Sequence, residues 1–278
     1  NISREMLQHD RQLKFIAGNL EKKIKAELAK LMEQDREKYE KFYAAFGMQI
    51  KYGVLNDYGA KKELLQDLLL YWSHKQNKLV SFKEYVDAMP EEQKYIYFAS
   101  GENRQRLSQL PQLEKLGEKG FDVLLMTDEV DSFVPQTLGK YAEKDFRSVT
   151  QEDLGLSTDE EKKEAAEQAE KSKATLEFVK TTLGDDVKEV RLSENLGTHP
   201  VCMVPEEGMT FEMGMKAGRI LELNPNHRLF GLLQVAVAQD EEKAKKIAKI
   251  LYAQALLMAD LPLENPGEYT DLVCELVQ

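Results

Sequence analysis

The sequence predicts an α/β fold, α+β overall. It combines a three-layer α/β/α unit that has a small parallel sheet with a mixed α+β domain that ends in a helical hairpin. Three observations predict this. Two apolar strands, Tyr95–Phe98 and Phe121–Met126, enclose a helical segment; a stretch rich in Glu and Lys divides the chain; and two amphipathic helices close it. A chain of 278 residues is long enough for about two domains.

Two helices are predicted before the first strand. The first carries one apolar face, made by Leu13, Ile16, Leu20, Ile24, Leu28 and Leu31. The second has a stripe that we expect in the core, made by Tyr39, Phe42, Tyr43, Phe46 and Ile50. The glycines of the following segment, residues 53–61, have the wrong spacing for a phosphate-binding loop, so we expect a surface turn.

The sheet is predicted from the order of the next elements. Ser81 and Glu84 form a capping box that starts a short helix. The strand, helix and strand between Tyr95 and Met126 make a βαβ unit, whose strands run parallel with helices on both faces. Residues 146–149 are a candidate third strand.

Carboxylates follow the second predicted strand. Asp128, Glu129 and Asp131 could form a cluster for acid–base chemistry. A solvated loop that caps the next helix is the interpretation we favour, because neither strand end offers a nucleophile with a base.

A domain boundary is predicted between residues 155 and 156. The stretch Gln151–Lys173 is rich in Glu and Lys and has almost no aliphatic core. A capping box from Ser157 to Glu160 indicates that this exposed linker becomes helical, and Gly184 ends the helix.

The second domain begins with two strands, Val187–Leu192 and Pro200–Val204, joined by a turn. Residues 220–223 form a further strand, after which Asn224 can cap a helix that starts at Pro225. We expect His227 to be a structural hydrogen-bond donor and not a catalyst.

Two closing helices, Asp240–Met258 and a helix that starts at Pro266, are apolar on more than one face. Such helices need more than their own domain to cover them. Two such hairpins paired across a two-fold axis would form a four-helix bundle, so the sequence predicts a homodimer. The residues expected at this interface are Ile247, Ile250, Leu251, Leu257, Met258, Tyr269, Leu272 and Leu276.

Composition excludes several classes of function. The net charge of −11 argues against binding to nucleic acid or to an anionic membrane, and no apolar run approaches the roughly 20 residues of a membrane span. Cys202 and Cys274 lie in apolar strings, as buried thiols of a reducing cytoplasm do. The four histidines and two cysteines lack metal-ligand spacing, so we expect no metal.

The first residues suggest an anion site. Arg4 and Gln8 lie one helical turn apart, at a helix start that could hold a nucleotide phosphate. The alternative is that Arg4 pairs with a nearby carboxylate. The chain begins without an initiator Met or a signal peptide, and we therefore expect a fragment of a longer protein.

Two motifs resemble the ninety-kilodalton heat-shock chaperone family, in its bacterial HtpG form. Residues 2–8 resemble N-x-S-R-E-x-L-Q, and residues 219–227 resemble x-x-[IL]-E-[LI]-N-P-x-H. The resemblance implies the later middle domain in residues 1–155 and the C-terminal dimerisation domain in residues 156–278. It gives Arg4 a contact to the γ-phosphate of ATP, supported by Gln8. ATP and magnesium would bind an N-terminal domain outside this chain, which makes the full-length protein a weak ATPase and this fragment neither an enzyme nor a cofactor binder.

The same resemblance implies contacts to unfolded clients. Residues 131–138 resemble D-E-[WF]-x-x-x-x-L, which gives Phe133 the role of a client-binding aromatic flanked by Ser132 and Gln136. The alternative is that Phe133 is buried in the local core. Met209 and Met213 match methionines of an exposed family helix, although such a cluster is also typical of a core. This tract is about three helical turns shorter than in the family, so the helix is either absent or omitted from the sequence.

We therefore expect part of a cytoplasmic, homodimeric, ATP-dependent stress-response chaperone that binds unfolded proteins, without nucleic-acid or membrane partners. Two alternatives remain. One is a dimeric interaction scaffold without ATP coupling, and the other is a nucleotide-using α/β enzyme with its site on the parallel sheet.

Overall fold

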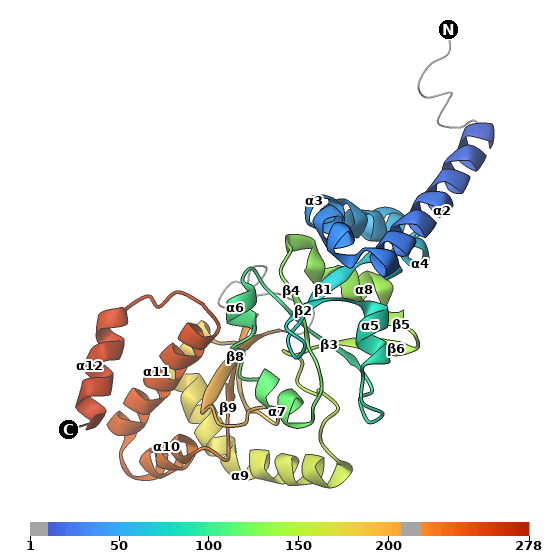
Figure 1. The fold of residues 1–278 in the computed structure, drawn as a ribbon. Helices are drawn as coiled ribbons and strands as arrows, with labels where there is room; N and C mark the ends of the chain where they lie inside the picture. The colour runs from blue at the N-terminus through green and yellow to red at the C-terminus, as the bar shows by residue number, and fades with distance from the viewer. Residues whose placement is uncertain (1–10, 207–217, 278) are drawn as a thin grey trace. The chain divides into compact units, whose positions relative to one another are not determined.

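A computed structural model describes residues 11–206 and 218–277 (Figure 1). By its internal contacts the chain divides into two units, and the division passes through strand β3 (Ile96–Ser100). Unit 1 contains the residues up to Ile96 together with Ser100–Glu102 and Leu124–Phe146. Unit 2 contains Tyr97–Ala99, Asn103–Val123 and the chain from residue 147 onward. The boundary at residues 155 and 156 stays a prediction.

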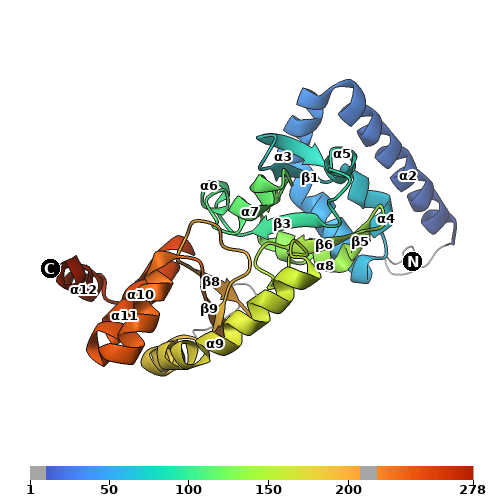
Figure 2. The same cartoon turned by 90° about the horizontal axis from the view of Figure 1, so that it is seen from below.

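Unit 1 begins with the two expected long helices, α2 (Arg11–Gln34) and α3 (Arg36–Leu55) (Figure 2). Asp35 separates them and caps α3, because its carboxylate accepts a hydrogen bond from the Lys38 amide at 3.1 Å. No residue of α2 is buried. The aromatic stripe of α3 is only partly in the core, since Phe46 is 53% exposed and stacks on Phe42 at a centroid distance of 5.3 Å.

Short elements complete the helical part of unit 1. They are η1 (Asn56–Gly59), α4 (Lys62–Leu65), η2 (Gln66–Leu68), α5 (Phe82–Asp87), η3 (Glu129–Ser132) and α8 (Val134–Leu138). The 3₁₀ helix η1 is the surface turn that the glycine spacing predicts, and Asp57 and Tyr58 adopt positive φ within it. The capping box of Ser81 and Glu84 starts α5 as predicted.

A six-stranded sheet has the order β2-β1-β4-β3-β6-β5. Besides β3, its strands are β1 (Leu70–Ser73), β2 (Lys78–Ser81), β4 (Leu124–Met126), β5 (Lys140–Tyr141) and β6 (Lys144–Ser148). Strands β3 and β4 are neighbours, and β6 confirms the third strand. Strand β1 is antiparallel to both β2 and β4. The α/β class is therefore confirmed, but the sheet is mixed rather than parallel, because β1, which the sequence did not predict as a strand, joins it in antiparallel pairs.

Unit 2 supplies the helices expected between β3 and β4, in two pieces. They are α6 (Arg104–Leu107) and α7 (Leu113–Glu118). Pro111 lies between them, and a proline in a helix interior removes a backbone donor. The predicted linker becomes helical as expected, because Asp159–Leu183 forms one 25-residue helix, α9. Its capping box joins Thr158 and Glu161, one residue later than expected.

After α9 comes the 3₁₀ helix η4 (Gly184–Asp186), and Gly184 takes φ +56° at the helix end, as expected of a C-terminal glycine. A three-stranded sheet follows, in the order β7-β9-β8. Its strands are β7 (Glu189–Leu192), β8 (Val201–Pro205) and β9 (Arg219–Leu223). Strand β9 is parallel to β7 and antiparallel to β8, so it separates the two strands that are consecutive in the chain.

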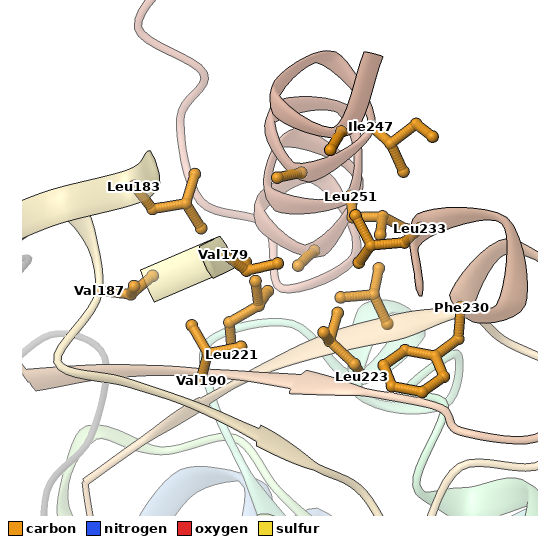
Figure 3. Packing of buried hydrophobic residues seen from close by; sticks show 14 of the residues in the cluster. Val179, Leu183, Val187, Val190, Leu221, Leu223, Phe230, Leu233, Ile247 and Leu251 are labelled. Carbon is orange, nitrogen blue, oxygen red and sulfur yellow. The ribbon is translucent and has the colours of Figure 1, made fainter. Parts of the chain in front are cut away.

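Three helices end unit 2: α10 (Arg228–Gln239), α11 (Glu241–Met258) and α12 (Pro266–Val277). His227 has a structural role as the cap of α10, but its Nδ1 accepts from the Leu229 amide at 3.1 Å, where a donor was expected. Asn224, expected as the cap, instead donates through Nδ2 to the carbonyls of Gly197 and His199 at 2.9 and 2.8 Å. The core joins α9, the sheet, α10 and α11 through Val179, Leu221, Leu223, Leu233 and Leu251 (Figure 3).

One buried carboxylate organises the polar contacts of this sheet, on the face that also buries Ile220, Cys202 and Val204. Glu222, in β9, accepts from Arg191 Nε and Nη2 at 3.0 and 2.7 Å and from Ser193 Oγ at 2.8 Å. Arg191 also donates to Glu152 at 2.7 Å. A buried charge is costly unless it is paired and hydrogen-bonded, and these contacts supply both conditions. The motif at residues 219–227, which resembles the chaperone family, thus contains a residue with a structural function, Glu222.

Candidate functional site

The candidate site is the short turn that follows β4. Asp128 and Asp131 close η3, since the Asp128 amide donates to Asp131 Oδ2 at 2.9 Å and the Asp131 amide donates to the Asp128 carbonyl at 2.8 Å. Phe133 comes directly after η3, and its amide donates to the Val130 carbonyl at 3.1 Å. The turn therefore ends at the aromatic residue singled out from the sequence.

Phe133 is 41% exposed, whereas Val134, which follows it, and Asp131, two residues before it, are fully buried. The alternative that placed Phe133 in the local core is therefore wrong. Gln136 is also exposed, and Ser132 is half-buried. The buried residues Asp131 and Val134 hold the backbone before and after Phe133, while its aromatic ring stays partly exposed.

The helix after Phe133 is fixed at both ends. Pro135 is buried in the first turn of α8, where a missing backbone donor has no cost. At the other end, Lys62 Nζ donates to the carbonyls of Thr137 and Leu138 at 3.1 and 3.2 Å. A cation at these last carbonyls satisfies acceptors that the helix itself leaves open.

A buried lysine holds the carboxylates of η3. Lys51 in α3 is only 3% exposed, and its Nζ lies 2.7 Å from both Asp131 Oδ1 and Asp128 Oδ2. The ring centroid of Tyr71 lies 4.6 Å from the same Nζ, and the Tyr71 hydroxyl donates to Asp131 Oδ1 at 3.2 Å. The expectation of a solvated loop is therefore wrong for Asp131, which is buried. The expected capping is confirmed, because the Asp131 carboxylate accepts from the Asp128 amide at the start of η3.

The electrostatics of this group favour a structural role. Burial raises the pKa of Asp131, and the Lys51 ammonium and its hydrogen bond act in the opposite direction. Burial also raises the pKa of Tyr71 well above its ordinary value, and the Asp131 carboxylate adds to this effect. Because Lys51 occupies both aspartates, the acid–base alternative for this cluster loses its support.

The sequence analysis did not identify Lys51. A signal was available, because Lys51 continues a row at four-residue spacing that contains Tyr39, Tyr43 and Gly47. A lysine that continues a buried helical row needs an acidic partner. The partner could not be chosen from the sequence, since Asp131 lies 80 residues further along the chain.

The residues predicted at a dimer interface separate into three groups by their exposure. Ile247, Ile250 and Leu251 are buried, and Figure 3 shows Ile247 and Leu251 among the core residues of unit 2. Leu257 and Leu276 are 52% and 37% exposed. The remaining three are half-buried: Met258, Tyr269 and Leu272.

Four predicted site residues, Arg4, Gln8, Met209 and Met213, lie outside the described residues.

Cys202 is buried, and Cys274 is exposed, contrary to expectation. Within residues 11–206 and 218–277 no three His, Cys, Asp or Glu side chains are arranged to hold a metal ion. No helix in the same ranges has the length and apolar character needed to cross a membrane.

Comparison with known proteins gives one consistent result. A family model described as "Hsp90 protein" matches residues 1–278. The "Chaperone protein HtpG" of Bacillus subtilis (strain 168) is 49% identical over 288 residues, which cover 100% of this chain and 46% of that protein. Proteins of the same name from Clostridium acetobutylicum and Oceanobacillus iheyensis are 45% and 46% identical over 289 residues, with the same coverage. The chain thus spans about half the length of these curated relatives.

The buried tyrosines of unit 1 predict a loss of stability at alkaline pH. Burial raises the pKa of Tyr39 to about 12 and raises the pKa values of Tyr43, Tyr71 and Tyr141 as well. Unfolded tyrosines ionise near pH 10, so above about pH 10 the folded state holds more protons and its free energy of unfolding falls with pH. Each such tyrosine steepens this fall by up to about 1.4 kcal/mol per pH unit.

Urea unfolding followed by circular dichroism across this pH range measures the effect. Tyrosinate absorbance provides the check, because these four side chains should ionise only as unit 1 unfolds. Full titration of all tyrosines near pH 10 in the folded protein would contradict the prediction.

Proposed function

The chain belongs to the Hsp90 protein family, and from this premise we propose that it is the client-binding and dimerising part of an ATP-dependent chaperone. The relatives named as HtpG chaperones align with the whole of this chain, but the aligned part is only about half of each relative. The activity of the longer protein is therefore proposed for this chain rather than shown. The proposed setting is cytoplasmic, and the proposed partners are unfolded or partly folded proteins and a second copy of the chain.

The observation that carries the proposal is the exposure of Phe133 in a segment where Asp131 and Val134 are fully buried. A chaperone must contact many unrelated apolar segments, and a fixed aromatic ring offers apolar area at a low cost in conformational entropy. Exposed carboxylates and amides lie close to it in the chain, at Glu129 and Gln136. This arrangement supports reversible contact with client proteins.

The proposed dimer interface uses the outer face of the α11–α12 hairpin. Two ion pairs join the helices, from Lys249 Nζ to Glu268 at 2.8 Å and from Lys246 Nζ to Glu275 at 2.6 Å. Among the predicted interface residues, those that remain exposed or half-buried are Leu257, Met258, Tyr269, Leu272 and Leu276. Packing them against a second copy would complete a four-helix bundle, while Ile247, Ile250 and Leu251 support the hairpin from inside.

Replacing Phe133 by Ala should weaken chaperone activity. We expect the affinity for an unfolded protein to fall about tenfold, the usual effect of losing one aromatic anchor, with the stability of the chain nearly unchanged. Fluorescence anisotropy with a permanently unfolded, labelled protein measures this. Phe46→Ala is the matched control, since Phe46 is also an exposed aromatic residue of unit 1. Equal losses in the two variants would contradict a specific role for Phe133.

Charges on the hairpin should dissociate the dimer. In Leu257→Asp combined with Leu276→Asp, two carboxylates would have to be buried at the interface, so we expect the dimer dissociation constant to rise at least tenfold. Sedimentation equilibrium at micromolar concentrations reports it. Leu232→Asp, on exposed α10 surface, is the control. A parent chain that remains monomeric would overturn the dimer proposal itself.

ATP coupling is proposed through Arg4 and Gln8, by the family resemblance of their motif. In the longer protein, an Arg that reaches the γ-phosphate stabilises the charge of the transition state. Arg4→Ala should therefore lower the ATPase rate of the longer protein by about a thousandfold, with Arg11→Ala as control. An unchanged rate would favour the other candidate, a dimeric scaffold without ATP coupling.

A further inference from the structure

We propose that Lys51 is a positioning residue for the Phe133 surface, because its buried ammonium holds η3 in the conformation that presents the aromatic ring. This inference rests on the proposed client-binding function. Lys51 lies in α3, and its two carboxylate partners lie 77 and 80 residues later in the chain. The contact therefore fixes the turn relative to a helix that it does not follow in sequence.

The ammonium is fully engaged by groups around η3. A lysine ammonium has three donors. Here they face Asp131, at 2.7 and 2.9 Å to its two oxygens, and Asp128, at 2.7 Å. The Tyr71 ring covers the ammonium from a centroid distance of 4.6 Å, which adds a cation–π contact.

The same two aspartates define the geometry of the turn. The Asp131 amide donates to the Asp128 carbonyl at 2.8 Å, and the Asp128 amide donates to the Asp131 carboxylate at 2.9 Å. Phe133 is the first residue after this turn. If the Asp131 carboxylate rotated away from Lys51, it would also lose the hydrogen bond that it accepts from the Asp128 amide. The position of Phe133 thus depends on the ion pair through two residues of backbone.

Stability alone does not require a charged pair at this place. Replacing a buried ion pair by apolar or neutral groups of similar size is often neutral or stabilising, whereas removing one partner is costly. The ion pair does constrain geometry, because two carboxylates and the Tyr71 ring together fix the position of the Lys51 ammonium relative to the turn. Positioning of the turn is the role that this geometry fits.

The test compares variants of this chain that separate stability from positioning. Lys51→Met combined with Asp131→Asn removes both buried charges, and the asparagine carbonyl can still accept from the Asp128 amide. Lys51→Met alone leaves Asp131 buried without its cation, so it should unfold at a lower urea concentration. The matched control is Lys25→Met, which breaks the half-exposed ion pair to Asp67, 3.1 Å in length, in the same unit.

The readouts are affinity for reduced, carboxymethylated α-lactalbumin and amide hydrogen exchange. For the double variant we expect about a tenfold loss of affinity, as for Phe133→Ala, with an unfolding midpoint near that of the parent chain. The amides of Asp131 and Phe133 should lose protection from exchange, while those of α3 keep it. Lys25→Met should bind like the parent chain.

Two results would overturn the inference, and they differ in what else they affect. A double variant that binds like the parent, or that loses protection throughout unit 1, overturns only the assignment of Lys51. If Phe133→Ala itself binds like the parent chain, the client surface at Phe133 is wrong, and the positioning role is lost with it.

Discussion

The buried ion pair between Lys51 and Asp131 is the constraint on which the candidate site depends. It joins α3 to the turn after β4, two elements that are far apart in the sequence. Three polar side chains, those of Lys51, Asp131 and Tyr71, are buried together, and each satisfies another. Because a buried polar group without a partner is costly, this set can hold only a narrow range of geometries.

Unit 2 solves a similar problem around Glu222. Its carboxylate lies in the central strand of the three-stranded sheet, where Arg191 and Ser193 of the neighbouring segment complete its hydrogen bonds. The other face of the sheet packs apolar side chains against α9, α10 and α11 (Figure 3). Both units therefore combine an apolar core with buried charge whose partners come from other segments of the chain.

Helix α11 shows why exposure had to be known before residues could be assigned to an interface. Its sequence is apolar on more than one face, and the sequence analysis placed Ile247, Leu251 and Leu257 together at a dimer contact. The structure places Ile247 and Leu251 in the core of their own unit and leaves Leu257 exposed. Sequence periodicity reports how much of a helix is apolar, but the surrounding chain decides which face is already covered.

The sequence by itself determined the α/β class, most helices and strands, and the residues at several helix ends. These features depend on neighbours within about four residues, such as the capping box of Ser81 and Glu84 or the glycine that ends α9. Local patterns also selected Phe133 as a candidate, but they left its exposure open.

Only the tertiary structure decided which distant segments meet. It placed β9 between β7 and β8, made the six-stranded sheet mixed, and brought Lys51 to Asp131. The physical reason is that strand neighbours and the partners of buried charges are chosen by the packing of the whole chain. No repeat or spacing in the sequence records that packing.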